Sequence, residues 1–397
     1  MSVIYLDNNA TTQVDPVVFE KMKPYFLDQF YNASSNTHSL GIQVKNVVEE
    51  SRELIAELFN RNPQEIIFTS GSTESINLAL KGIFHEVQNR NLITTSVEHK
   101  AVLDAAESIS NNETIYIQPN RFGQVTPEQI ESRIDKNTKI VSVISTNNEI
   151  GTDINLNDIL EVLSDEIVFH TDATQSLTHD KEGLTAIGLL QERVDMLSVS
   201  AHKFHGPKGV GLLIANKKTQ DNLFPIIHGG NHERGLRSGT LNVPGIVGLA
   251  EALKIQNESE ISVEKLRIEF EEQLIEKLPD EVKYSINGMR PTSPIFQKEH
   301  GVLENELSGH PGNVSITFED IQATSIIAGV PELAVSTGSA CTSATPSPSH
   351  VLQEIGLSLE EAQSTIRISL SRFTTKEEVK DATDMITVAV KDYLERI

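Results

Sequence analysis

The fold is decided by a stretch in which two apolar runs enclose a polar turn: Met196-Leu197-Ser198-Val199-Ser200-Ala201-His202-Lys203-Phe204-His205-Gly206-Pro207-Lys208-Gly209-Val210-Gly211-Leu212-Leu213-Ile214. The runs 196–200 and 209–214 are short and rich in valine, leucine and isoleucine, which predicts strands. The turn carries a lysine and two histidines and is bounded by glycine. Because ligands of α/β proteins bind at strand ends, the stretch predicts a sheet with a functional site at its edge.

Five more strand-like runs precede this stretch. They alternate with helical patterns, such as the apolar residues spaced along one face from Val44 to Leu58. This alternation is typical of an α/β fold with a mostly parallel sheet. We therefore predict a seven-stranded, mostly parallel sheet in a large domain. The five runs are Ile66 to Thr69, Leu92 to Ser96, Thr114 to Gln118, Lys139 to Ser145 and Ile167 to Thr171.

The pattern changes near residue 250. A long acidic helix is expected from about Gly248 to Leu278, followed by a stretch interrupted by Pro, Gly and Ser. Strands are predicted at 313–318 and 365–369, and Thr375-Lys376-Glu377-Glu378 has the spacing of a capping box that opens a final helix. The sequence thus predicts a large domain of residues 16–250 and a smaller α+β domain of residues 1–15 and 251–397.

Composition excludes several classes of protein. The 397 residues include 33 Lys and Arg against 56 Asp and Glu, a net charge of −23, so direct nucleic-acid binding and attraction to anionic membranes are not expected. No stretch approaches the roughly 18 apolar residues of a membrane span. The N-terminus lacks the features of a targeting signal, which predicts a cytoplasmic protein. Cys341 is the only cysteine, which excludes intrachain disulfides and multi-cysteine metal sites.

Several polar groups follow the predicted strands. Asp172 closes one strand and Gln175 follows it; a buried aspartate keeps the pyridine nitrogen of pyridoxal phosphate protonated. Lys203 stands where it could form a Schiff base with the same cofactor. Thr69-Ser70-Gly71-Ser72-Thr73-Glu74 has the strand, glycine turn and helix start of a phosphate cradle. Each feature alone has an ordinary structural explanation, but together they indicate a pyridoxal-phosphate site.

These segments resemble the cysteine desulfurases of the NifS/IscS class, from residue 3 to about residue 380. The resemblance implies a fold type I pyridoxal 5'-phosphate enzyme that works as a homodimer, with L-cysteine as substrate and a sulfur-acceptor protein as partner. The other matching motifs are Tyr5-Leu6-Asp7-Asn8-Asn9-Ala10-Thr11-Thr12, Glu98-His99-Lys100, Asn147-Asn148-Glu149-Ile150-Gly151, His228-Gly229-Gly230-Asn231-His232-Glu233-Arg234-Gly235, Arg237-Ser238-Gly239-Thr240 and Ser339-Ala340-Cys341-Thr342-Ser343-Ala344.

The resemblance also implies roles for the matching residues. Lys203 would bind the cofactor covalently, Asp172 would pair with the pyridinium, and Gln175 would donate a hydrogen bond to the ring hydroxyl. His99 would stack on the ring and shuttle protons. Cys341 would be the nucleophile that takes sulfur as a persulfide and leaves L-alanine. The implied substrate ligands are Arg367, which would fork the carboxylate, and Asn148, which would also contact the cofactor. The implied phosphate ligands are Ser72, Thr73, Ser200, His202 and, across a dimer interface, Thr240.

The loop around Cys341, about residues 336–349, is expected to be exposed and mobile, which suits a sulfur carrier.

Two features depart from the family. Residues 31–38 lack the glycine and proline of the family pattern, and the carboxy-terminal extension of members that bind an Fe–S scaffold is absent. Three sulfur recipients therefore stay open: an iron-sulfur cluster scaffold, a tRNA-thiolation relay and the machinery of DNA phosphorothioation.

Other functions fit parts of the sequence. A selenocysteine lyase, or another pyridoxal-phosphate-dependent aminotransferase or lyase, would not need Cys341. A non-catalytic scaffold could keep the fold without the chemistry. A zinc hydrolase would use His202 with His205 and His228 with His232, because such spacings can share a metal. These histidines lie on glycine-rich turns and not on one helix face, so we predict no metal site.

Overall fold

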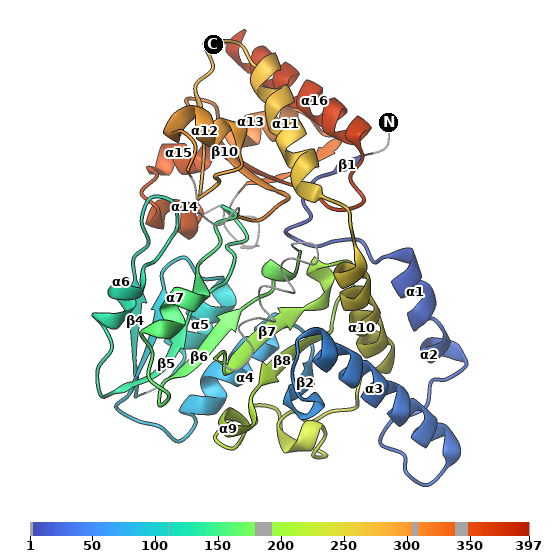
Figure 1. Ribbon diagram of the computed structural model, residues 1–397. Coiled ribbons are helices and arrows are strands. Elements are labelled where there is room, and N and C mark those ends of the chain that lie inside the picture. Colours follow the sequence, from blue (N-terminus) through green and yellow to red (C-terminus); the bar gives the residue numbers. More distant parts are fainter. Residues whose placement is uncertain (1–2, 110, 179–192, 304–308, 338–347, 397) are drawn as a thin grey trace.

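The computed structural model describes residues 3–109, 111–178, 193–303, 309–337 and 348–396. Its larger sheet has seven strands in the order β2-β8-β7-β6-β5-β3-β4 and fills the lower half of Figure 1. Neighbouring strands are parallel except around β8, which is antiparallel to β2 and β7. The prediction of a mostly parallel seven-stranded sheet is confirmed. The strands are β2 (Ile66–Thr69), β3 (Asn91–Thr95), β4 (Glu113–Ile117), β5 (Thr138–Ser142), β6 (Val168–Asp172), β7 (Met196–Ser200) and β8 (Gly211–Ala215).

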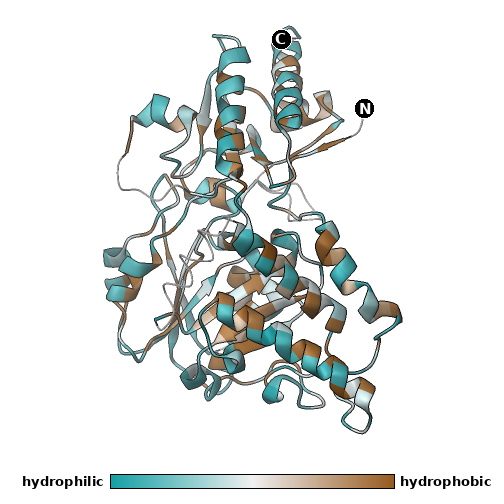
Figure 2. Cartoon of the chain, turned by 45° about the vertical axis from the view of Figure 1, so that its right-hand side comes forward, coloured by the Kyte–Doolittle hydropathy of each residue, from teal (hydrophilic) through white to brown (hydrophobic). Residues whose placement is uncertain are grey.

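Helices cover both faces of this sheet. They are α1 (Pro16–Met22), α2 (Pro24–Leu27), α3 (Ser39–Leu58), α4 (Ser72–Phe84), α5 (Lys100–Glu107), α6 (Pro127–Glu131), α7 (Leu156–Glu161), α9 (Lys217–Gln220) and α10 (Val243–Glu258). Successive strand residues point to opposite faces, so Ile67 packs with α4 and α5 whereas Phe68 packs with α3 and α10. Burial on both faces explains why apolar strand residues such as Ile67 and Phe68 point to both sides of the sheet. In Figure 2 brown, apolar residues are concentrated among the strands in the centre of this part, and the surrounding helices carry teal, polar residues as well.

A second sheet is antiparallel and has the order β12-β13-β10-β9. Ile4 and Leu6 pack into its core, because β1 pairs in parallel with β11, so the N-terminal strand lies with the C-terminal part of the chain. The exact domain limits stay a prediction. The elements of this part are β1 (Ile4–Tyr5), β9 (Tyr284–Ile286), β10 (Asn313–Phe318), β11 (Leu333–Ala334), β12 (Ser336–Thr337), β13 (Thr365–Ser369), α11 (Val263–Lys277), α12 (Pro294–His300), α13 (Ala323–Gly329), α14 (His350–Glu354), α15 (Leu359–Gln363) and α16 (Lys376–Leu394).

The single long helix predicted between residues 248 and 278 is wrong. Ser259 and Ser262 have extended backbones, with ψ of 131° and 99°, and separate α10 from α11. The Ser259 hydroxyl accepts a hydrogen bond from the backbone N–H of Ile261 at 3.4 Å, and such local bonds compete with helix continuation. Leu253 packs with the first core and Val263 with the second, so the change between the cores falls at this break.

Candidate active site

Polar side chains gather where the large sheet faces the second sheet. Asp172 is the last residue of β6, and Lys203 follows the end of β7. His99 and Asn148 follow β3 and β5. Arg367 of β13 reaches the same place, because its Nη1 donates a hydrogen bond to the Asn148 carbonyl at 3.2 Å. The structure thus brings these predicted residues together from both parts of the chain.

Asp172 is a buried carboxylate with 5% of its surface exposed. Its Oδ1 accepts a hydrogen bond from the backbone N–H of Thr174 at 3.0 Å. Nearby, Gln175 Oε1 and Thr174 Oγ1 are buried without hydrogen-bond partners among the described residues. Buried polar atoms are normally satisfied, so these groups fit a polar ligand. The carboxylate in particular fits the protonated ring nitrogen of pyridoxal phosphate.

Lys203 is held by the N-terminal segment. Its Nζ donates hydrogen bonds to the backbone carbonyls of Asn9 and Ala10, at 2.7 and 2.9 Å. Gln175 Nε2 donates to the same Asn9 carbonyl at 3.1 Å. The lysine and the glutamine predicted to contact the cofactor therefore share one backbone acceptor.

His99 is the N-cap of α5, because its Nδ1 accepts a hydrogen bond from the Ala101 N–H at 3.1 Å. Burial lowers the pKa of His99; Asp172 opposes this effect and Lys203 adds to it. The ring is therefore neutral at neutral pH, with its proton on Nε2. Its neighbour Glu98 is fully buried, and burial raises the pKa of that carboxyl to about 8. A neutral imidazole and a neutral carboxylic acid thus lie side by side in the sequence.

The start of α4 is open to an anion. Its N-cap is Gly71, which has a φ of 152° and offers no capping side chain, so backbone N–H groups of the first turn, where Ser72 and Thr73 lie, remain for a ligand. The space is narrow: a Cβ on Gly71 would lie 3.4 Å from Ser200 Oγ, and a Cβ on Gly211 would lie 2.6 Å from the Gly71 Cα. Three of the predicted phosphate ligands therefore surround a glycine turn, as a phosphate cradle requires.

The rings of His202 and His205 are both neutral, and each forms a hydrogen bond. His202 Nδ1 hydrogen-bonds with Thr11 Oγ1, and His205 Nδ1 with the Gln13 carbonyl, each at 3.0 Å. Burial lowers the pKa of each ring to about 4. Within the described ranges, no group of three or more His, Cys, Asp or Glu side chains is arranged to hold a metal ion. These observations weigh against the zinc hydrolase.

Arg367 is almost fully buried, with 1% of its surface exposed. Its Nη2 pairs with Asp7 Oδ1 at 2.8 Å, and its Nε has no hydrogen-bond partner among the described residues. Asn9 Nδ2 donates at 3.1 Å to the same Asn148 carbonyl that Arg367 binds. A positioned guanidinium with an unsatisfied N–H suits the carboxylate of an amino acid.

Cys341 lies outside the described residues. The predicted loop of residues 336–349 is described only at its two ends. The prediction that the loop is exposed is wrong at these ends, because Ser336 and Ser349 are buried. Each hydroxyl is held by a carboxylate: Ser336 Oγ donates to Asp7 Oδ1 at 3.1 Å, and Ser349 Oγ donates to Glu149 Oε2. The chain that leads to and from the Cys341 segment is therefore fixed beside Arg367 and the Asn148 loop.

Thr240 is the predicted ligand that the structure does not bring to the others. It is exposed, and no hydrogen bond joins it to another residue of the described ranges. The segment before it is well fixed, because Arg237 Nε pairs with Glu74 Oε1 of α4, and Arg52 Nη2 with Glu233 Oε1, both at 2.7 Å.

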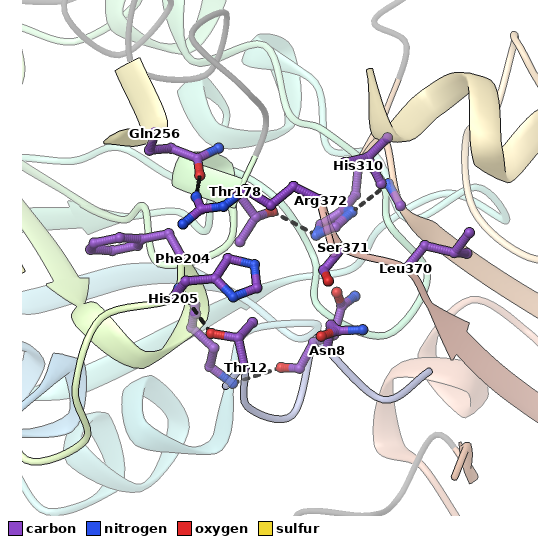
Figure 3. Close-up of a pocket in the computed structure, with 14 residues that line it drawn as sticks. Asn8, Thr12, Thr178, Phe204, His205, Gln256, His310, Leu370, Ser371 and Arg372 are labelled. Carbon is purple, nitrogen blue, oxygen red and sulfur yellow. Dashed lines mark hydrogen bonds between the residues drawn. The ribbon is translucent and has the colours of Figure 1, made fainter. Parts of the chain in front are cut away.

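A small cavity of about 30 Å³, lined by polar and apolar side chains, lies beside Lys203 (Figure 3). The N-terminal segment and the residues after β13, Ser371 and Arg372, line it from different sides. His310 Nε2 hydrogen-bonds with Thr178 Oγ1 at 2.7 Å, and Thr178 Oγ1 donates to the Gln175 carbonyl at 2.6 Å. These bonds join the second part of the chain to the predicted cofactor site.

Sequence reasoning missed three residues of the site. It assigned no role to Asp7, Asn9 or Glu98, although each lies in a motif that carries the family resemblance. Asp7 and Asn9 contact Arg367 and Lys203. One available signal was the polar run Asp7-Asn8-Asn9 directly after a short apolar strand. Their contacts depend on β13 and on residue 203, which sequence spacing does not reveal.

The model of the aminotransferase class-V family matches residues 4–381. The chain therefore belongs to this family, whose enzymes depend on pyridoxal phosphate. The geometry of Asp172, Gln175, the Gly71 turn and Lys203 is compatible with that cofactor, and their individual roles stay predictions.

The relatives identify the group within the family. A cysteine desulfurase IscS from Pseudomonas entomophila is 39% identical over 398 residues, covering 98% of this chain and 92% of the relative. A solved NifS-like protein is 34% identical with a TM-score of 0.83, covering 98% of this chain and 99% of that chain. SspA in complex with cysteine is 34% identical with a TM-score of 0.74, covering 94% and 99%. The predicted resemblance is confirmed, and the chain is a pyridoxal-phosphate-dependent enzyme of the cysteine desulfurase group.

Proposed function

We propose that this enzyme converts L-cysteine to L-alanine and transfers the sulfur to Cys341 as a persulfide. The observation that carries the proposal is one hydrogen-bond network around which Asp172, Lys203 and Arg367 lie. Lys203 and Gln175, three residues after Asp172, donate to the Asn9 carbonyl, and Asn9 and Arg367 donate to the Asn148 carbonyl. Asp172, Lys203 and Arg367 supply an anion for the cofactor ring, an amine to hold the cofactor and a guanidinium for the substrate carboxylate. In the reaction the C–S bond of cysteine breaks, an S–S bond forms with the Cys341 sulfur, and a proton completes the methyl group of alanine.

Each polar group has a task in this reaction. Bound pyridoxal phosphate supplies an electron sink that makes cleavage of the C–S bond feasible. Asp172 holds the proton of the ring nitrogen, and Arg367 with Asn148 orients the amino acid. Neutral His99 can accept a proton at one time and return it at another, which a permanently charged group could not do. Ser72, Thr73, Ser200 and His202 hold the phosphate.

The assembly and the acceptor are finer parts of the proposal. A homodimer would allow the exposed Thr240 of each subunit to complete the phosphate site of the other. Exposed Phe224, Ile226 and Ile227, which precede this segment, suit such an interface. No helix of the described part is long and apolar enough to cross a membrane. We infer a cytoplasmic enzyme that passes sulfur to an acceptor protein, for cluster assembly, tRNA thiolation or DNA phosphorothioation.

The test is a reaction of the pyridoxal-loaded protein with L-cysteine and a reductant, with alanine and sulfide measured together. Equal release of both is expected from the wild type, and loss of both is expected from Cys341→Ala. Alanine formation by Cys341→Ala at the wild-type rate would overturn the persulfide step and favour the selenocysteine lyase or another lyase of this fold. Neither product from the wild type would overturn cysteine as the substrate of the isolated enzyme.

A further inference from the structure

Three residues of the N-terminal segment, Asp7, Asn9 and Ala10, contact two cationic side chains of the site, Lys203 and Arg367. The Asp7 carboxylate binds Arg367 Nη2 at 2.8 Å, and the Asn9 and Ala10 carbonyls accept from Lys203 Nζ at 2.7 and 2.9 Å. In the proposed reaction both cations take other partners, Lys203 the cofactor and Arg367 the substrate. The N-terminal segment therefore holds positions that the ligands must share or take over.

Asp7 and Arg367 differ in how easily their contact can be exchanged. Arg367 lies between β10 and β12, has its Nη1 fixed on the Asn148 carbonyl and is 1% exposed. The Asp7 side chain is 19% exposed. Moving the Arg367 side chain would leave a buried positive charge without a partner. The Asp7 carboxylate can instead turn toward water, which costs less free energy. The aspartate is thus the partner that can leave.

We propose that Asp7 is an internal carboxylate that the carboxylate of an incoming amino acid replaces on Arg367, so that Asp7 sets the affinity of the site for its substrate. The proposal rests on the proposed function, in which Arg367 binds that carboxylate. Before the amino acid arrives, Asp7 neutralises a buried guanidinium that would otherwise be unpaired. The amino acid must then compete with an acceptor that is already in place, and the two carboxylates repel each other at one guanidinium.

The same carboxylate oxygen of Asp7 also contacts β12. Ser336 Oγ donates to the same Asp7 Oδ1 at 3.1 Å, and Ser336 lies in β12, the last described strand before Cys341. A change at Asp7 therefore alters a contact of β12. Arg367 and Ser336, which are also paired in neighbouring strands, thus share one carboxylate oxygen of Asp7.

The experiment measures binding of L-alanine, the product, to the holoenzyme by calorimetry, for the wild type and Asp7→Asn. Asparagine keeps an acceptor oxygen for Arg367 and removes the charge, so L-alanine should bind about three- to tenfold more tightly to the variant, as expected for the loss of one nearby charge. L-Alaninamide, which lacks the carboxylate, should bind both proteins equally. The KM for L-cysteine should fall by the same factor as the Kd for L-alanine, without a matching rise in kcat.

Asp15→Asn is the matched control, because Asp15 pairs with Arg372 at 2.6 Å and does not touch Arg367. It should leave the affinity for L-alanine unchanged. If Asp7→Asn melts below the assay temperature, Asp7→Ser serves as a second neutral variant with the same expectation. Unchanged or weaker binding of L-alanine by a folded neutral variant would overturn the proposal and leave Asp7 only an orienting role. L-Alanine binding needs no sulfur transfer. A wild type that binds L-alanine without making sulfide from cysteine would therefore contradict the proposed function and not the role of Asp7.

Discussion

Lys203 Nζ and the carbonyl oxygen of Asn9 lie 2.7 Å apart, although 194 residues separate them in the chain. The acceptor is a backbone atom, so it stays in place whatever side chain stands at position 9. Removing the lysine is therefore the direct way to test this contact and the proposed covalent attachment together.

Lys203→Ala should abolish covalent attachment of pyridoxal phosphate and lower the turnover of cysteine by at least about a thousandfold, since nucleophile losses are of that size. Reduction with borohydride followed by mass spectrometry should find the cofactor fixed to residue 203 in the wild type and no fixed cofactor in Lys203→Ala. Lys208→Ala, a lysine on the same turn, is the control and should keep the label. A labelled Lys203→Ala protein would contradict the assignment.

Asp172→Asn should keep the fold and lose the buried anion. Without that charge the ring nitrogen gives up its proton, so turnover should fall by about a hundredfold or more. The ultraviolet–visible spectrum of the bound cofactor should shift, which reports on the ring independently of turnover. Asp195→Asn keeps only one of the two hydrogen bonds that Asp195 accepts, from the Phe169 N–H at 2.8 Å and from Asn216 Nδ2 at 2.6 Å, and should leave the spectrum unchanged. An unaltered spectrum in Asp172→Asn would exclude contact with the ring.

Glu98 should make the protein less stable as pH rises. Burial raises the pKa of this carboxyl from 4.5 to about 8. The folded state then holds the proton more tightly than the unfolded state, so the stabilisation is full below about pH 4.5 and is lost as pH rises through 8. The free energy of unfolding should fall by about 1 to 3 kcal/mol between pH 6 and pH 8.5 in the wild type, and by less in Glu98→Gln.

Urea unfolding at the two pH values measures this difference. The pKa of Glu149 is also raised by burial, to about 7, but this group is present in both proteins and its contribution cancels. Glu233→Gln, which breaks a buried pair with Arg52, should lower stability at both pH values and keep the wild-type slope. Equal slopes in the wild type and Glu98→Gln would refute the prediction.

Ser349→Ala should cost more stability than the loss of an ordinary helix cap. Ser349 Oγ accepts a hydrogen bond from the Leu352 N–H at 3.2 Å and also donates to the buried Glu149. Losing the cap costs about 1 kcal/mol, and leaving a buried acceptor unpaired adds about 1 to 3 kcal/mol. Ser358→Ala, the exposed cap of α15, should cost only the first amount. Equal melting temperatures for the two variants would show that the Glu149 contact contributes nothing.

The sequence predicted those parts of the fold that depend on local pattern. The seven strand runs each overlap an observed strand, because short runs rich in β-branched and other apolar residues between helical patterns are a local signal of strands. The final helix begins after Thr375 with the predicted capping box. The Thr375 hydroxyl accepts a hydrogen bond from the Glu378 N–H, and the Glu378 carboxylate accepts one from the Thr375 N–H. The break between α10 and α11 was missed, because the helical pattern continues on both sides and only the Ser259 hydroxyl interrupts it.

The candidate site was predictable as a set of residues and not as a network. Asp172 and Lys203 stand at strand ends, which motif reasoning can locate. The partners of Arg367 were not predictable. Asp7 lies 360 residues away in the sequence, and a parallel β-bridge between Asp7 and Ser369 brings it to Arg367. Contacts between the first and last parts of a chain leave no trace in local spacing.

The pairing of the N-terminal segment with β13 also affects how the protein is made. Asn9 emerges from the ribosome first, yet its partner Ser369 is synthesised 360 residues later. At about 5 to 20 residues per second the delay is tens of seconds. Throughout that time Asp7 and Asn9 lack the strand they bind, so the pair between Asp7 and Arg367 forms only near the end of synthesis. Catalytic competence is therefore among the last properties that the nascent chain acquires.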